Sequence, residues 1–73
     1  MPLLPVISGA QAIKAFSCAG WRFVRQKGSH AILIKSGHIA SLSIPQHREL
    51  APGTLRSLIR SSGLTVDEFV VLL

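Results

Sequence analysis

Hydrophobic residues recur at helical spacing near the start of the chain. Ser8 and Gln11 stand three residues apart, the spacing of a capping box in which each side chain accepts a bond from a free backbone amide. Gly20 is the expected left-handed residue that ends a helix. We therefore predict a helix from residue 8 to about residue 19, whose apolar face carries Ala12, Ile13, Phe16 and Ala19.

Alternating patterns follow Gly20 and predict two strands. Residues 21–26 and residues 31–35 are rich in β-forming side chains, and Lys27-Gly28 between them favours a turn. The alternation in the second strand places His30 on the same side as Ile32 and Ile34. Because these isoleucines are expected core residues, we expect His30 at the rim of the sheet or just before the strand.

A third strand is predicted at residues 38–44. Ser36-Gly37 favours a tight turn, so the second and third strands are expected to form an antiparallel hairpin. Pro45 ends the third strand because it has no amide hydrogen to donate. The buried face of this strand is expected to carry Ala40, Leu42 and Ile44.

Two helices are predicted to complete the chain. Pro52 suits a first helical turn, and Gly63 is the expected stop. The apolar stripe of this helix comprises Leu55, Leu58 and Ile59. Thr65 and Glu68 form a second capping-box pattern. It opens a short last helix with the expected apolar residues Val66, Phe69, Val70 and Leu73.

The element order is therefore α-β-β-β-α-α, an α+β class. The economical packing is a three-stranded antiparallel sheet with the helices on one face. A chain of 73 residues is expected to form a single domain, residues 1–73, with residues 1–7 as an N-terminal extension. No apolar run approaches the length that spans a bilayer, and the start lacks the pattern of a signal peptide. We expect a cytoplasmic protein with no membrane association.

The charge balance changes the functional expectation. Eight Lys and Arg stand against three acids, a net charge of +5, and all eight cations precede Ser61. Such a field favours nucleic acid or an acidic protein surface as partner. Cys18 is a lone cysteine with no disulfide partner, and the three histidines lack the clustered ligands of a zinc site. We expect no metal and no cofactor.

His30 is the first candidate for chemistry. Imidazole gains and loses protons near neutral pH, and RNA supplies its own nucleophile, the 2′-hydroxyl. The neighbouring Arg25, Lys27 and Lys35 are near enough in sequence to stabilise charge on a phosphorane. The spacing alone, however, favours a structural histidine bonded to backbone at a strand end.

Other side chains extend this candidate site. His47 follows the third strand, and the predicted hairpin brings it near His30, where it is either a second proton donor or an exposed loop residue. Ser29 is placed to bind phosphate with its hydroxyl. Arg56 and Arg60 share one helix face, where they either track phosphates or are simply solvated. Trp21 and Phe23 are candidates for stacking on bases or for the core.

Four motifs in order resemble one family. They are Ala19-Gly20-Trp21, the run from Arg25 through Gly28-Ser29-His30, the segment Ser43-Ile44-Pro45-Gln46-His47, and residues 52–59, followed by Ser62-Gly63-Leu64-Thr65. Over residues 8–73 the chain resembles the HicA toxins, small ribonucleases of type II toxin–antitoxin pairs.

The resemblance implies properties that periodicity does not. It implies a fold like the double-stranded-RNA-binding domain, metal-independent cleavage of mRNA, and His30 as the catalytic histidine. It also implies a HicB-type antitoxin that binds the toxin in a hetero-oligomer and covers its active site. Our hypothesis is that His30 activates the 2′-hydroxyl, Lys27 and Arg25 hold the phosphate, and His47 or water serves the leaving group.

Two alternatives stay open from the sequence. A non-catalytic RNA-binding module of the same fold needs cations but no titrating histidine. Alternatively, the protein only binds another protein: its basic surface would bind an acidic protein, and it would show no salt-sensitive affinity for RNA.

Overall fold

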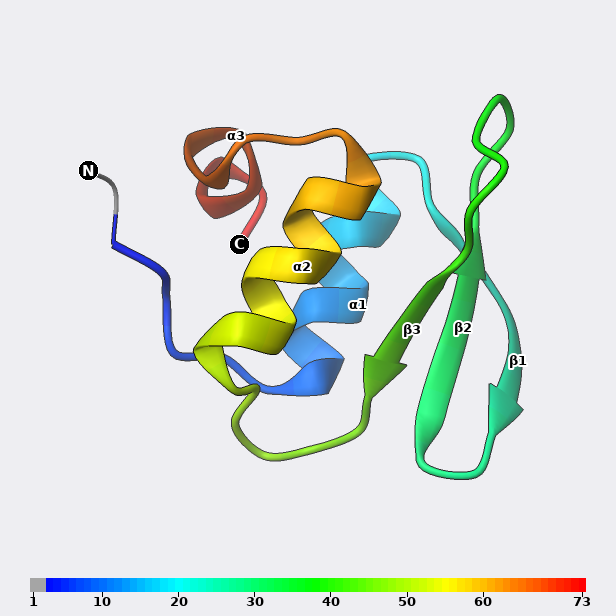
Figure 1. Cartoon of the computed structure of the whole chain (residues 1–73), viewed down its shortest axis with the longest axis horizontal. Coiled ribbons are helices and arrows are strands. Elements are labelled where there is room, and N and C mark those ends of the chain that lie inside the picture. Colours follow the sequence, from blue (N-terminus) through cyan, green and yellow to red (C-terminus); the bar gives the residue numbers. More distant parts are fainter. Residues whose placement is uncertain (1–2) are drawn as a thin grey trace.

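The computed structural model describes residues 3–73 and has the predicted order of elements. The helices are α1 (Gly9–Cys18), α2 (Pro52–Ser62) and α3 (Val66–Val71), and the strands are β1 (Arg22–Lys27), β2 (His30–Ile34) and β3 (Leu42–Pro45). The strands form one antiparallel sheet in the order β1-β2-β3. Figure 1 shows all three helices on one side of this sheet, with α2 in front of α1.

Local signals in the sequence place the helix ends correctly. Ser8 and Gln11 form the expected capping box at the start of α1, and Thr65 and Glu68 form the second one at the start of α3. Gly20 and Gly63 both adopt positive φ, at 99° and 82°. An L side chain rarely tolerates that backbone, so glycine ends both helices without strain.

The third strand is shorter than predicted. The ladder between β2 and β3 begins at the pair Leu33 and Leu42, so the expected strand over residues 38–44 is wrong for its first four residues. The Ser36-Gly37 turn forms, but the His38 ring then lies against the Trp21 ring, with 5.1 Å between their centroids. Residues 35–41 lie outside the strands. They form a loop at the end of the sheet away from the β1–β2 turn (Figure 1).

The buried face of the sheet is the opposite of the one expected for β2. Ala31 and Leu33 are 1% and 0% exposed, whereas Ile34 is 37% exposed. Ile32 and Ile34 therefore point outward, and the prediction that they belong to the core is wrong. The core lies between the sheet and the helices, and its sheet side is Ala31, Leu33, Leu42 and Ile44.

A β-bulge interrupts the first strand. Phe23 pairs with Leu33 and Arg25 pairs with Ile32, which leaves Val24 without a partner in the ladder. The extra residue reverses the alternation of side chains. An unbroken strand would turn the side chains of Phe23 and Arg25 to the same face, and the bulge places them on opposite faces.

The last helix closes the core with only part of the predicted apolar face. Phe69 is fully buried, and the centroid of its ring lies 4.8 Å from the ring centroid of Phe16 in α1. Val66 and Leu72 are partly buried beside them. Val70 and Leu73, which we expected on the apolar face, are largely exposed.

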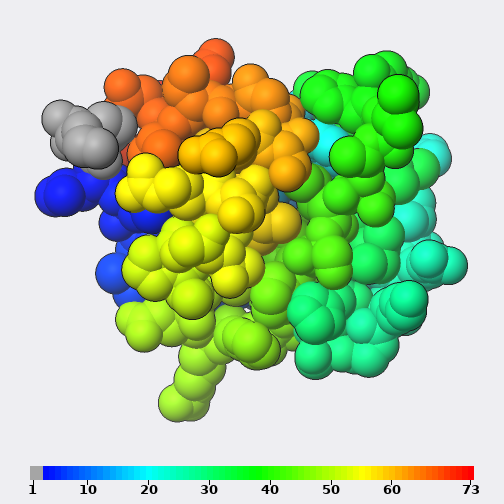
Figure 2. Space-filling view, in the orientation of Figure 1, coloured from blue at the N-terminus to red at the C-terminus, as the bar shows by residue number. Residues whose placement is uncertain are grey.

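The segment before α1 packs on the helical side of the molecule. Ile7 is buried, and its carbonyl accepts a hydrogen bond from the Leu50 amide, 2.8 Å away. Leu4 packs partly against the core. Figure 2 shows α2, in yellow, filling the space against β3, in green, so that the helices and the sheet form one continuous body.

Candidate functional site

His30 opens β2 beside the hairpin turn, on the outer face of the sheet. In the ladder it stands directly opposite Lys27 of β1 and opposite Pro45 of β3. Residues paired in this way project from the same face, with their Cβ atoms about 5 Å apart. Because the helices cover the other face, the imidazole of His30 lies partly exposed and accessible from solvent.

The turn that presents His30 is fixed on both sides. Gly28 takes the first of the two turn positions with φ 59°, the conformation that a tight two-residue hairpin needs there. The Ser29 carbonyl accepts a 2.7 Å hydrogen bond from the Gln46 amide just beyond β3. The Gln26 side chain donates to the Gly28 carbonyl at 3.0 Å. These bonds hold the turn to both neighbouring strands.

Three cations lie along the outer face of β1. Lys27 is opposite His30, and Arg25 is opposite Ile32, one outward position further along β2. The bulge at Val24 brings Arg22, opposite Ile34, onto the same face. The sequence prediction did not include Arg22. Unbroken alternation would put residues 22 and 25 on opposite faces.

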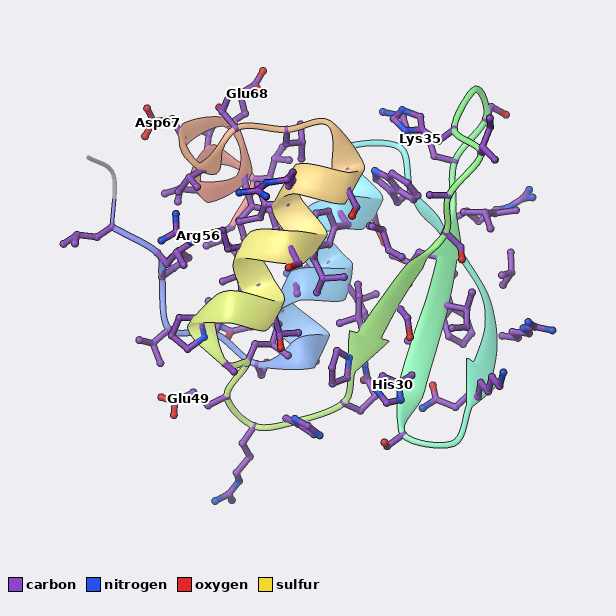
Figure 3. The ribbon with its side chains drawn as sticks, in the orientation of Figure 1. His30, Lys35, Glu49, Arg56, Asp67 and Glu68 are labelled. Carbon is purple, nitrogen blue, oxygen red and sulfur yellow. The ribbon has the colours of Figure 1, made fainter. Side chains whose placement is uncertain are left out.

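The structure brings only part of the predicted set of residues to His30. Arg25, Lys27 and Ser29 are close to it in the hairpin, whereas Lys35 follows the far end of β2. Arg56 and Arg60 are exposed on α2, in the helical layer. Figure 3 shows His30 at one end of the sheet, Lys35 at the other, and Arg56 on the helical side.

His47 lies two residues beyond the partner of His30, where the chain has left the sheet. Its carbonyl accepts a 2.9 Å hydrogen bond from the Gly9 amide at the start of α1. Its side chain lines a shallow groove with residues 4–6 and 49–52, and His30 is not part of that lining. The register places His30 opposite Pro45, two residues before His47, and the two histidines do not line one pocket.

The two aromatic candidates differ in solvent exposure. Trp21 is 2% exposed and belongs to the core, so it is not available to stack on a base. Phe23 is 49% exposed on the edge strand and remains accessible. Within residues 3–73, His, Cys, Asp and Glu side chains form no group of three that would hold a metal ion.

Comparison with known proteins identifies the family to which the chain belongs. The model of the HicA toxin of bacterial toxin–antitoxin systems matches residues 9–64. The chain belongs to the HicA toxin family. A search of curated proteins found no match.

A solved structure supports the same relationship for this HicA-family chain. A chain described as a toxin–antitoxin complex from Streptococcus pneumoniae is 30% identical to it and superposes with a TM-score of 0.72. The alignment covers 80% of this chain and 98% of that one. The match to the HicA model spans α1 to the end of α2 and therefore includes His30 and the cations of β1. In the part of the chain that the structure describes, no helix has the length and hydrophobicity needed to cross a membrane.

Proposed function

We propose that this HicA-family toxin is an endoribonuclease that cleaves mRNA, with His30 as its catalytic residue. The observation that carries the proposal is the pair of His30 and Lys27, directly opposite each other on the open face of the sheet. A proton-transferring group beside a fixed positive charge is what cleavage of an RNA phosphodiester requires. The open face leaves room for a polymer, which an enclosed pocket would exclude.

The reaction follows from the substrate and these side chains. His30 accepts the proton of the 2′-hydroxyl, and the 2′-oxygen attacks the adjacent phosphorus. Lys27 and Arg25 stabilise the extra negative charge of the phosphorane, and the Ser29 hydroxyl donates a hydrogen bond to a phosphate oxygen. The bond to the 5′-oxygen then breaks, and His47 or water protonates that oxygen. The nucleophile belongs to the RNA, so this route requires no metal ion.

The remaining cations extend the proposed contact with RNA beyond the reacting phosphate. Lys35 lies on the sheet side, and Arg56 and Arg60 lie on α2. In this proposal, each of the three cations binds a phosphate of the RNA backbone away from the scissile bond. We further propose that the toxin acts in the cytoplasm and is neutralised there by a HicB-type antitoxin in a hetero-oligomer. The likeness to the pneumococcal toxin–antitoxin complex supports an antitoxin as the partner.

Induced expression in a bacterial host tests the proposal. We expect the wild type to arrest growth and deplete mRNA, and His30→Ala to do neither while accumulating as a folded protein. Purified His30→Ala is expected to bind RNA but to cleave it at least about 100-fold more slowly, the usual contribution of a general acid or base. Lys14→Gln, which removes a cation on α1 remote from the sheet's outer face, is the matched control.

The same experiment separates the alternatives. If wild type and His30→Ala both arrest growth with RNA intact, the protein acts by binding, and catalysis by His30 is wrong. A protein with no salt-sensitive affinity for RNA would instead favour the protein-binding alternative.

A further inference from the structure

A cationic groove lies at the end of the sheet away from His30. It is lined by Gly20, Arg22, Ile34, Lys35, Ser36 and His38. Arg22 and Ile34 form the last pair of the β1–β2 ladder, and the groove opens beside the loop of residues 35–41. The three acidic residues lie elsewhere, Glu49 before α2 and Asp67 and Glu68 in the first turn of α3 (Figure 3). The groove therefore presents positive charge without a neighbouring carboxylate.

Two of its polar side chains are held in place by packing. The stem of Lys35 lies across Gly20, so close that a Cβ on Gly20 would stand 3.2 Å from the Lys35 Cε atom. The His38 ring lies against the buried Trp21 ring. A lysine or histidine restrained by its neighbours loses less conformational entropy when it binds a ligand than a freely moving side chain does.

The cations of β1 connect this groove to His30. Arg22 lines the groove, Arg25 follows on the same face, and Lys27 ends the row opposite His30. From His30 to Ile34 the strand advances four residues, about 13 Å at the usual rise. A few nucleotides of one extended nucleic-acid strand are long enough to cover that distance.

We propose that the groove is a phosphate-binding subsite for the RNA strand, and that the strand lies along β1 between the groove and His30. This inference rests on the proposed function, because it places the same substrate on the same face of the sheet. Arg22 and Lys35 bind a backbone phosphate several nucleotides away from the scissile bond. His38 and the Ser36 hydroxyl donate hydrogen bonds to the same phosphate or to its sugar. The contact is to backbone, so it adds affinity and direction but no base specificity.

The test measures binding with His30→Ala protein, which cannot consume the RNA under the proposed mechanism. A fluorescent single-stranded RNA of about 12 nucleotides is titrated against this protein and against Lys35→Gln, Arg22→Gln and Lys14→Gln versions of it. We expect Lys35→Gln and Arg22→Gln each to weaken binding about three- to tenfold and to reduce the salt dependence by about one counterion. Lys14→Gln removes the same charge as Lys35→Gln from the helical side, and we expect less than a twofold change.

Amide NMR spectra of the same samples locate the RNA and show that each variant is folded. We expect RNA to shift the amides of Gly20 and Ser36 as well as those of Gly28 and Ser29. In the Lys35→Gln protein, only the Gly28 and Ser29 amides should still shift fully. The groove is not a subsite if Gly20 and Ser36 do not shift, or if Lys35→Gln binds RNA as tightly as Lys14→Gln.

The two proposals fail in different ways. If the wild type cuts RNA but the groove variants bind it like the control, only the groove proposal is wrong. If RNA occupies the groove in the spectra but the wild type never cuts it, cleavage is wrong and the groove proposal stands.

Discussion

Gly9 and Pro45 are packed backbone against backbone. A Cβ built on Gly9 would overlap the Pro45 carbonyl oxygen, and the Gly9 amide donates a 2.9 Å hydrogen bond to the His47 carbonyl. Pro45 is also the residue opposite His30 in the sheet. The start of α1 thus sets the position of the strand end that borders the candidate site.

Gly9→Ala is expected to destabilise the protein by about 2 kcal/mol, because the methyl group must displace backbone rather than a flexible side chain. Urea unfolding of the purified variant measures this loss. Gly53→Ala is the matched control, since a Cβ there meets nothing within 4 Å and Gly53 lies in the first turn of α2. We expect that control to be neutral or stabilised by about 0.5 kcal/mol. Equal stability of the two variants would contradict the close packing of Gly9.

Phe69→Ala is expected to cost about 3–5 kcal/mol, because it removes a fully buried ring in contact with Phe16. This tests whether α3, which lies beyond the segment matched by the family model, is part of the folded core. Thermal unfolding followed by circular dichroism provides the measurement. Val71→Ala, at an 82% exposed position of the same helix, should change stability by less than about 0.5 kcal/mol. A small effect of both substitutions would mean that α3 does not hold the fold together.

RNA with a 2′-O-methyl group at the scissile nucleotide is expected to bind but not to be cut. The methyl group removes the proton that His30 takes and blocks the nucleophile, while the phosphates that meet Arg25 and Lys27 are unchanged. Gel analysis of cleavage and anisotropy of binding, on the same oligonucleotide, give the two readouts. Cleavage of the methylated RNA at the normal site would rule out attack by the 2′-oxygen.

Lys27→Gln is expected to lower kcat/KM for RNA cleavage at least about tenfold, because a charge directly opposite His30 stabilises the phosphorane more than the bound substrate. Lys27→Arg keeps the charge and should restore most of the activity. Steady-state cleavage of a defined oligonucleotide separates the effects on kcat and KM. A loss in Lys27→Gln no greater than in Lys14→Gln would remove Lys27 from the proposed catalytic site.

The candidate site was predictable in part. The motif Gly28-Ser29-His30 and its basic neighbours Arg25 and Lys27 stand together in the sequence, and a two-residue hairpin keeps them together in space. Lys35 is also near in sequence, but an extended strand carries it to the other end of the sheet. Arg22 required knowledge of the bulge, which no local pattern marks.

The sequence by itself determined the elements whose ends depend on local interactions. Capping boxes at Ser8 and Thr65, and the stops at Gly20 and Gly63, satisfy helix termini with groups only a few residues away. Only the tertiary structure decided which face of β2 is buried, where β3 begins and that Arg22 joins the outer face. Those features depend on strand register and on what packs against the sheet. A shift of one residue in register exchanges its two faces, so contacts between distant segments decide between them.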